Sequence, residues 1–335
     1  MLASTTTVQQ EYQALRSGAA LQRRPSGGVL ALADADRVDF LQRMTTNDVK
    51  ALTGTAAAGQ SCITVLTSPT AKIVQVFTVL ARADDLLLLP ALGAAEALAR
   101  HLRGQIFFMD KVKVSDLSAQ FARLRLMGPQ ALTALAATGL DLNGVGEGEW
   151  RGRDGLLVVA QRHYDLPGFE IVVAQERREE IVTRLAAVGA AVLEGDEAYQ
   201  AQRIELGRPL PGAELIGEYS PLEAGLAWAC AENKGCYTGQ EIIARQITYD
   251  KVTRTLVGIV ADEPLTAGAA LTADGREVGT ITSAARSPLV GSPIALAIVK
   301  RPHDGAVTEL LVEGKPVRVT ALPFTGPSHD AAIMK

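Results

Sequence analysis

The sequence predicts an α+β protein with two related β-α-β-β-α-type domains in tandem, followed by a small antiparallel β-barrel. An apolar pattern recurs at a constant offset in the first two-thirds of the chain, where strand-like and helix-like periods alternate. From about residue 251 the pattern changes to short β-rich runs separated by Gly, Pro and Asp turns, which is typical of a small barrel. The 335 residues suffice for two or three domains of about 100–200 residues each.

The internal repeat rests on four apolar positions in each copy, two in an expected strand and two in the helix after it. They are Leu30, Leu32, Val38 and Leu41 in the first copy, and Leu124, Leu126, Leu132 and Leu135 in the second. Each copy then continues into two β-type runs and a second helix. We expect these at 73–80, 86–89 and 94–102, and again at 156–160, 169–173 and 176–188. Two tandem units are the economical interpretation.

The pattern divides the chain into four parts. We place an N-terminal arm at 1–24, the first α+β domain at 25–116, the second at 117–250 and the barrel at 251–335. The arm could be a docked helix or a frayed end. The expected barrel strands lie at 256–260, 277–282, 294–299, 308–312 and 316–321.

Composition narrows the class of protein. The net charge is −4, and the chain has no basic block and few aromatic residues, which argues against a broad nucleic-acid-binding face. The N-terminus lacks the basic and apolar regions of a secretory signal, and no run of about 18 apolar residues occurs. We therefore expect a cytoplasmic protein that contacts neither nucleic acid nor membrane directly.

The three cysteines are Cys62, Cys230 and Cys236. An odd and sparse set fits a reducing compartment better than a disulfide framework. Cys230 and Cys236 do not form a CxxC pair, and no histidine lies near them in the sequence. We therefore expect no zinc or iron–sulfur site built from protein ligands alone.

The run from 234 to 241 places a thiol between a cation and an expected helix. Thr238 and Glu241 have capping-box spacing, with Thr238 as the N-cap. Cys236 would lie just before the helix N-terminus, where the helix dipole and Lys234 both favour a thiolate. The alternative is that Cys236 is a small packed residue in a structural turn. The remaining members of the run are Gly235, Tyr237, Gly239 and Gln240, and the glycines would allow a tight turn or close approach of a ligand.

This octet resembles the K-G-C-Y-x-G-Q-E signature of the YgfZ family, folate-binding proteins related to the glycine-cleavage T-protein, an aminomethyltransferase. The resemblance extends over about residues 28–324. It implies a T-protein-like fold, with two α+β domains and a barrel, and binding of tetrahydrofolate or a one-carbon derivative. It also implies that Cys236 is the working thiol of an accessory protein. That protein would support iron–sulfur cluster assembly or repair, and indirectly tRNA modification, with iron–sulfur assembly or client proteins as partners.

Two further segments are similar to family motifs, and each has a structural alternative. Asn47 lies in the segment 40–49, which looks like the family's segment after the first strand. The resemblance implies a folate contact, whereas Asn47 could equally end a helix in a left-handed conformation. Arg203 opens a run similar to the family's R-x-E-x-G helix end, where the arginine reaches folate. The alternative for Arg203 is an ion pair involving Glu205.

Glu170 ends a Gly-Phe-Glu motif similar to the T-protein segment whose glutamate binds the pterin ring. A carboxylate suits this task because the pterin edge offers two adjacent N–H donors. Without the motif, Glu170 would be interpreted as a solvated residue at the start of a strand. His163 stands where T-proteins usually carry a tyrosine, so the resemblance is incomplete there.

The chain departs from the T-proteins at their aspartate pair, which follows a Gly-rich hairpin as G-G-x-x-D-D. In the corresponding stretch, 70–76, the two positions hold Gln75 and Val76. Neither residue can accept or donate a proton at neutral pH, so general acid–base assistance is lost. Three functions remain open: an accessory folate-binding protein, an aminomethyl or one-carbon transferase with another acid–base group, and a non-catalytic folate-binding scaffold.

Overall fold

The computed structural model describes residues 7–324, which fall into two compact units. Within these residues, unit 1 comprises 7–67, 75–195 and 233–238. Unit 2 comprises 68–74, 196–232 and 239–324. The chain therefore passes repeatedly from one unit to the other, and neither unit is a single continuous segment.

The first half of unit 1 follows the predicted order of elements. Its elements are β2 (Leu30–Ala33), α2 (Arg37–Met44), β3 (Ala58–Thr67), β4 (Ile73–Ala81), β5 (Asp85–Pro90), α3 (Ala95–Gly104) and β6 (Lys113–Asp116). The strand residues Leu30 and Leu32 and the helix residues Phe40 and Leu41 are fully buried in one core. The apolar period that predicted this strand and helix therefore marks their inward faces.

The second half repeats this order, which confirms the internal duplication. Its elements are β7 (Phe121–Met127), α4 (Ala131–Leu135), β8 (Glu149–Arg153), β9 (Leu156–Gln161), β10 (Gly168–Ala174), α5 (Arg178–Ala187) and β11 (Ala191–Val192). Leu132 is the exception among the repeat positions, because its side chain is 46% exposed. The short helix α4 instead buries Ala131, Ala134 and Leu135.

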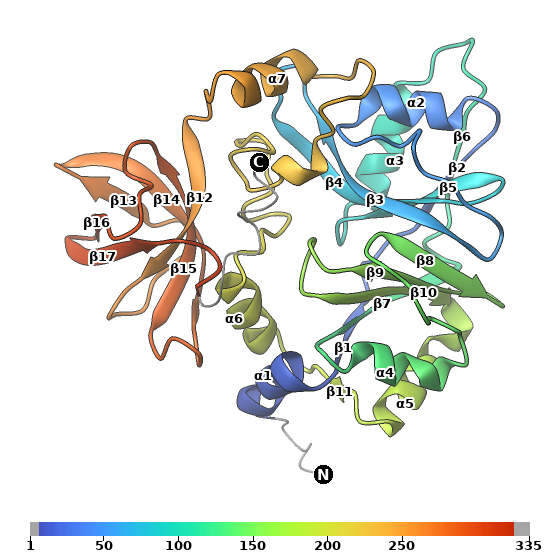
Figure 1. Cartoon of the computed structure of the whole chain (residues 1–335), viewed down its shortest axis with the longest axis horizontal. Coiled ribbons are helices and arrows are strands. Elements are labelled where there is room, and N and C mark those ends of the chain that lie inside the picture. Colours follow the sequence, from blue (N-terminus) through green and yellow to red (C-terminus); the bar gives the residue numbers. More distant parts are fainter. Residues whose placement is uncertain (1–6, 325–335) are drawn as a thin grey trace. The chain divides into compact units, whose positions relative to one another are not determined.

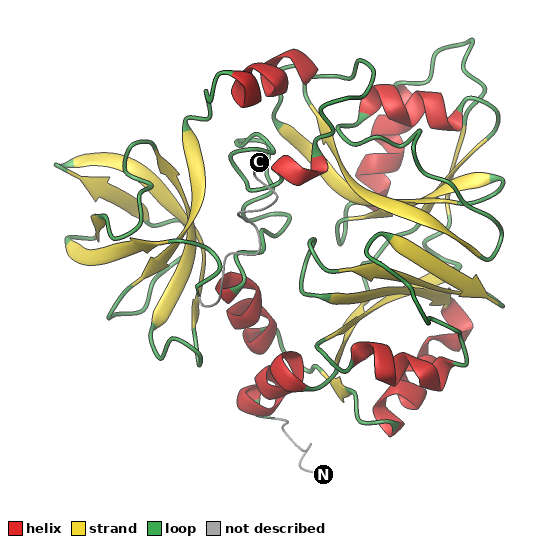
Figure 2. Ribbon diagram, in the orientation of Figure 1, coloured by secondary structure: helices red, strands yellow, loops and turns green. Residues whose placement is uncertain are grey.

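One eleven-stranded sheet runs through unit 1 in the order β11-β1-β7-β10-β9-β8-β3-β4-β5-β2-β6. Figures 1 and 2 show α2 and α3 on the outer face of the first half-sheet, and α4 and α5 on that of the second. The inner faces pack against each other through Leu80, Leu87, Trp150 and Val159, among others. The Trp150 indole donates a hydrogen bond of 3.0 Å to the Ala81 carbonyl and so joins the halves.

The part expected as an N-terminal arm is regular structure over its described residues. Helix α1 (Val8–Ser17) begins with a capping box between Thr7 and Gln10. Strand β1 (Ala20–Arg24) then lies within the sheet, antiparallel to β7 and parallel to β11. The polar residues of β1 hide this strand from pattern analysis. Residues 1–6 of the expected arm lie outside the described residues.

Unit 2 contains the predicted barrel. It is a closed antiparallel barrel of β12 (Arg254–Val260), β13 (Ala270–Ala273), β14 (Arg276–Arg286), β15 (Pro293–Lys300), β16 (Glu309–Val312) and β17 (Lys315–Thr320). The five expected strands are present, and β13 is the strand that the pattern did not predict. Helices α6 (Glu197–Glu205) and α7 (Gln240–Thr248) also belong to unit 2. Residues 325–335 of the expected barrel domain lie outside the described residues.

Candidate functional site

The ammonium group of Lys234 is coordinated by the C-terminal end of helix α2. Its Nζ donates hydrogen bonds of 2.8 Å to the carbonyls of Gln42 and Asn47, and a third to the carbonyl of Thr45. The same nitrogen lies 4.9 Å from the centre of the Tyr237 ring. A cation at this end of a helix satisfies carbonyls that lack an intrahelical donor and complements the helix dipole. Lys234 thus attaches the signature segment to unit 1.

The predicted capping box at Thr238 and Glu241 is wrong. Helix α7 begins at Gln240, with Gly239 as its N-cap and no side-chain cap. Gly239 has φ +83°, a left-handed conformation that glycine adopts without a Cβ penalty. The Thr238 carbonyl accepts a 2.5 Å hydrogen bond from the Thr67 hydroxyl, and Glu241 pairs with Arg245 on the helix surface.

Cys236 is exposed, as a working thiol must be. The other two cysteines differ, since Cys230 is buried and Cys62 is partly buried. Burial raises the pKa of the Cys62 thiol to about 12, against a smaller lowering by the charge of Lys234. The sequence predicted that Lys234 would favour the Cys236 thiolate. In the structure its ammonium group is directed to the end of α2, so Lys234 has a structural role.

Asn47 lies beside Lys234, so the structure brings two of the predicted site residues together. It does not have the left-handed backbone expected of a helix end, because α2 ends at Met44 with Thr45 as its C-cap. Instead, the Asn47 amide donates a 2.8 Å hydrogen bond to the Ile63 carbonyl, and its side-chain oxygen accepts from the amide of Asp48. A folate contact by Asn47 stays a prediction.

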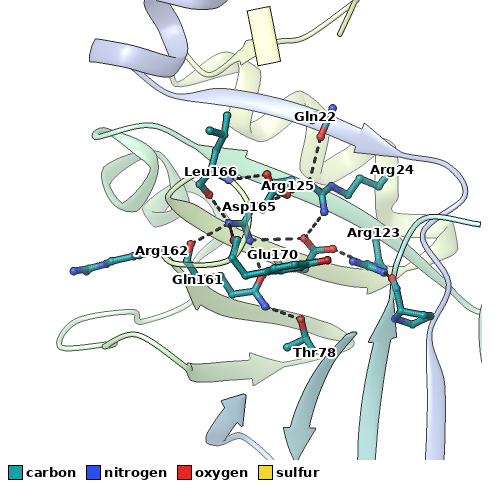
Figure 3. A network of polar contacts seen from close by, with 12 residues as sticks. Gln22, Arg24, Thr78, Arg123, Arg125, Gln161, Arg162, Asp165, Leu166 and Glu170 are labelled. Carbon is teal, nitrogen blue, oxygen red and sulfur yellow. Dashed lines mark hydrogen bonds and ion pairs between the residues drawn. The ribbon is translucent and has the colours of Figure 1, made fainter. Parts of the chain in front are cut away.

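Glu170 is 1% exposed and lies at the centre of a buried arginine network (Figure 3). Arg123 donates from Nε to one carboxylate oxygen at 2.6 Å, and Arg24 donates to the other at 3.3 Å. Arg125 lies 3.8 Å from the second oxygen. This differs from the solvated strand residue that the sequence without the motif suggests.

The network continues through Arg125, which is fully buried. Its guanidinium donates to the side chain of Gln161 at 2.8 Å and to the carbonyl of Leu166 at 2.6 Å. Gln161 in turn donates to the Thr78 hydroxyl at 2.7 Å, which links the two halves of unit 1 (Figure 3). Asp165 forms a further ion pair with Arg24. Burial in this region raises the pKa of Tyr164, so its phenol stays protonated.

Sequence analysis missed the arginines that surround Glu170. Arg123 and Arg125 alternate with Leu124 and Leu126 along β7, a pattern that normally indicates a solvated outer face. Knowledge of which strands pair would have revealed them, because β10 lies beside β7 with Glu170 opposite Arg125. Sheet register cannot be obtained from the periodicity of one strand.

Arg203 lies in unit 2, with its guanidinium bound to protein groups. It donates to Gln200 at 2.6 Å and to Ser283 at 2.6 Å, and it pairs with the buried Glu214 at 3.4 Å. An ion pair was one of the two expectations for this arginine, but its carboxylate is Glu214. Glu205 instead accepts a hydrogen bond from the Ser287 hydroxyl. The folate contact of Arg203 stays a prediction.

The stretch 70–76, which the resemblance matches to the aspartate pair of the T-proteins, contains a tight turn and the start of β4. Ala71 has φ +58° in the turn, and its amide donates to the Ser68 carbonyl at 2.9 Å. Val76 is 2% exposed and so is a core residue. Gln75 donates to the Ala94 carbonyl at 3.4 Å, while its side-chain oxygen is buried without a hydrogen-bond partner among the described residues.

These contacts define how the predicted residues could receive a reduced folate. The Glu170 carboxylate already accepts hydrogen bonds from Arg24 and Arg123, and its folate contact stays a prediction. Among residues 7–324, no cluster of three or more His, Cys, Asp or Glu side chains could hold a metal ion. No helix in the same range combines the length and apolar character that crossing a bilayer requires.

Two family models match the chain. Residues 3–234 match the GCVT N-terminal domain, and residues 254–326 match the glycine cleavage T-protein C-terminal barrel domain. Among curated proteins, a chloroplastic protein of Arabidopsis thaliana that carries the name putative transferase is 30% identical over 90% of this chain and 70% of its own length. An aminomethyltransferase of Rubrobacter xylanophilus is 30% identical over 95% of this chain and 86% of its own length.

Among solved structures, the aminomethyltransferase T of the glycine cleavage system from Bartonella henselae has the same fold. The TM-score is 0.86 at 24% identity, and the match covers 96% of this chain and 90% of that one. Both the duplicated α/β part and the barrel are therefore found in a known architecture. Apart from Lys234, the signature octet falls between the two segments that the family models match.

Proposed function

The chain belongs to the glycine cleavage T-protein family, and from this membership we propose that it is a tetrahydrofolate-binding accessory protein without aminomethyltransferase turnover. The role proposed for it, in line with the resemblance to the YgfZ proteins, is support of iron–sulfur cluster assembly or repair, and indirectly of tRNA modification. The proposed compartment is the cytoplasm, where reducing conditions keep all three cysteines free.

The observation that carries this proposal is the pair Gln75 and Val76 at the aspartate positions. An amide and a buried isopropyl group can neither take nor give a proton at neutral pH. General acid–base catalysis typically contributes about 10²–10⁴-fold to a rate, so a transferase without this group would be severely impaired. The fold, in contrast, is that of a T-protein over nearly the whole chain.

Cys236 is the residue that we assign to the accessory role. It is exposed on a segment that Lys234 and Thr238 fix to unit 1, so the thiol is presented from an anchored backbone. A thiol at the surface can exchange with a disulfide or ligate a cluster that a partner protein supplies. In this proposal a cluster is cargo, and the partners are iron–sulfur assembly or client proteins.

An aminomethyl or one-carbon transferase is the second candidate, because relatives that match over most of the chain carry the name aminomethyltransferase. This function needs a carboxylate to replace the missing pair. Glu170 is a poor replacement, since three arginines surround it and already occupy its oxygens. A scaffold that binds folate and needs no thiol is the third candidate.

The deciding experiment is a calorimetric titration of the wild type with tetrahydrofolate, combined with an aminomethyl-transfer assay that uses a lipoylated carrier protein. We expect saturable binding without turnover. Turnover would establish the transferase, and the absence of binding would remove folate from the proposed function. Asn47→Ala, Glu170→Gln and Arg203→Lys then test the three predicted contacts, with circular dichroism to confirm that each variant is folded.

The thiol needs a separate test in cells that lack the endogenous protein. We expect Cys236→Ala to fail to restore iron–sulfur enzyme activity and tRNA thiolation, while Cys230→Ala, a change at a buried thiol, restores both. Folate binding should be unchanged in Cys236→Ala. If Cys236→Ala restores both activities fully, the scaffold function replaces the accessory function.

A further inference from the structure

A cavity of about 710 Å³ opens in unit 1 beside the buried arginine network. Its wall contains the end of β1, the loop from Pro25 to Gly28, the first turns of α3 and α5, and the start of β7. No predicted site residue lines it: Asn47, Glu170, Arg203 and the signature octet all lie elsewhere. The volume lies in the range of small-molecule binding pockets, about 300–1,000 Å³.

Two buried arginines reach this cavity from the network in Figure 3. Arg24 is 9% exposed at its side chain and Arg123 is 5% exposed, and both belong to the cavity wall. Arg123 is fixed further, because it donates to the Pro90 carbonyl at 2.6 Å and to the Gly28 carbonyl at 3.3 Å. These contacts hold a guanidinium at the wall in one orientation before any ligand arrives.

The loop glycines allow this arrangement. A Cβ on Gly27 would lie 2.8 Å from the Arg123 Cβ, and a Cβ on Gly28 would lie 2.2 Å from the Ala95 Cβ. Any side chain at these two positions would therefore push the loop away from Arg123 and from the start of α3. Close approach of this kind is a reason for glycine at sites where backbone and side chains converge.

A second pair of arginines lies at the mouth of the cavity. Arg178 donates to the Glu179 carboxylate at 2.8 Å, and Arg23 lies 3.5 Å from the other oxygen of the same carboxylate. All three side chains are at least 36% exposed, so these contacts are exchangeable with solvent and with a ligand. The Glu179 carboxylate thus contacts the guanidinium groups of Arg23 and Arg178, and an anionic ligand could replace it at both.

The other acidic residues of the wall have partners of their own. Glu96 pairs with Arg100 one helical turn along α3, and Asp116 accepts from the amide of Ser118. Four arginines and three carboxylates therefore line the cavity. Phe121 adds an aromatic wall. The first turns of α3 and α5 add the positive ends of two helices, each of ten residues.

We propose that this cavity binds the phosphoryl group of a phosphorylated small molecule, with Arg123 and Arg24 at its wall and Arg23 and Arg178 at its mouth. The exchangeable guanidinium groups of Arg23 and Arg178 can match phosphate oxygens in pairs. Arg24 and Arg123, which already donate to Asp165 and Glu170, hold two guanidinium groups in place at the wall. Glu170 then has a positioning task, since it orients Arg24 and Arg123 by ion pairs from inside the sheet. The cavity exceeds a single phosphate, so Phe121 is available to the organic part of the ligand.

The test is a calorimetric titration of the full chain with pyrophosphate and, separately, with ATP. We expect Arg23→Gln and Arg178→Gln each to weaken binding by about tenfold, the usual scale for one charged hydrogen bond. Glu179→Gln should act in the opposite direction and strengthen binding, because it removes the internal competitor. Arg184→Gln is the matched control, since Arg184 lies on the same helix, pairs with Glu180 and does not line the cavity.

The two probes distinguish the sources of the phosphoryl group. Binding of pyrophosphate alone supports a small phosphate ligand, and tighter binding of ATP supports a nucleotide-sized ligand that uses the aromatic wall. The proposal is overturned if neither probe binds in the low millimolar range. It is equally overturned if Arg184→Gln weakens binding as much as Arg178→Gln, because the effect would then be one of overall charge. The substituted residues are on the surface, which keeps the variants folded.

Discussion

The ammonium of Lys234 donates a hydrogen bond of 2.8 Å to the backbone carbonyl of Asn47, across 187 residues of sequence. With the carbonyls of Gln42 and Thr45, this contact places the first residue of the signature octet on the end of helix α2. Lys234 therefore has a structural role in the motif that does not involve the Cys236 thiol.

We expect Lys234→Met to lower the free energy of unfolding by about 2–3 kcal/mol, because it removes a charged donor from three carbonyls at a helix end. Urea denaturation followed by circular dichroism measures this. Lys111→Met is the control, since Lys111 is exposed, and it should change stability by less than about 0.5 kcal/mol. Equal stability of the two variants would show that the three hydrogen bonds contribute nothing net.

The two glycines of the octet should respond differently to alanine. Gly239 has φ +83°, so Gly239→Ala should cost about 1–2 kcal/mol of stability. A Cβ on Gly235 would meet nothing within 4 Å, and the φ of Gly235 is not left-handed, so Gly235→Ala should leave stability unchanged. Thermal unfolding of both variants checks this. Any loss of function in Gly235→Ala would then indicate that a partner approaches the backbone at that point.

Glu170→Gln should destabilise the protein by about 3–5 kcal/mol, because it leaves buried arginines without their carboxylate. Glu179→Gln is the matched control on the surface and should leave the stability close to that of the wild type. Chemical denaturation of both variants gives the comparison. If Glu170→Gln is as stable as the wild type, the arginines do not depend on Glu170, and its assignment as their positioning residue is wrong.

We expect the reactivity of the two thiols Cys236 and Cys62 to depend differently on pH, and alkylation measures this difference. Near pH 8 we expect iodoacetamide to modify Cys236 rapidly in the native protein, whereas Cys62 stays protonated because burial raises its pKa to about 12. The ordinary pKa of this thiol is 9.0, so as the pH rises Cys62 ionises in the unfolded chain before it does so in the native protein. The stabilisation from Cys62 is full below pH 9 and is lost as the pH rises toward 12.

Mass spectrometry of the alkylated peptides, with Cys236→Ser as the control, measures the order of modification. Comparison of the wild type with Cys62→Ala in denaturant at several pH values measures the linkage. The stability difference between them should shrink only above about pH 9. A difference that shrinks already at neutral pH would contradict the burial of this thiol.

Restoring a carboxylate should have different costs at the two aspartate positions. Gln75 is partly exposed, so Gln75→Asp should change stability by less than about 1 kcal/mol. Val76 is 2% exposed, so Val76→Asp should cost about 3 kcal/mol or more. We expect Gln75→Asp to gain measurable aminomethyl transfer if the missing carboxylate is what separates this protein from the transferases. A folded Gln75→Asp variant without activity would mean that further residues are missing.

The fold was largely predictable because the duplicated domains repeat their apolar period. Leu30 and Leu41 predict β2 and α2, and the runs after them predict β4, β5 and α3. Strand β1 was not predictable, because Gln22, Arg23 and Arg24 carry no apolar alternation and its order comes from β7 and β11 on either side. Strand β13 has only four residues, with a bulge in its pairing to β14.

The sequence predicted individual candidate residues, which stay predictions, but it could not predict the contacts between them. The octet and Asn47 were recognised separately, yet the hydrogen bond between them joins segments that no local pattern connects. The arginines around Glu170 were invisible for the same reason, since they come from two strands distant in sequence. The predicted start of α7 was wrong because the N-cap is Gly239, in a left-handed conformation, and not Thr238.

The order of synthesis gives the repeated crossing between units a final consequence. Strand β1 is made before both of its partners, β7, which ends at Met127, and β11, which ends at Val192. On the ribosome, β1 therefore lacks its second partner until about 170 more residues have been made, which takes roughly 10–35 s. Unit 1 is completed only when Lys234 and Thr238 have been made. No single cut in the gene separates the two units. A nascent or truncated chain therefore exposes unpaired strand edges, which are sites of aggregation.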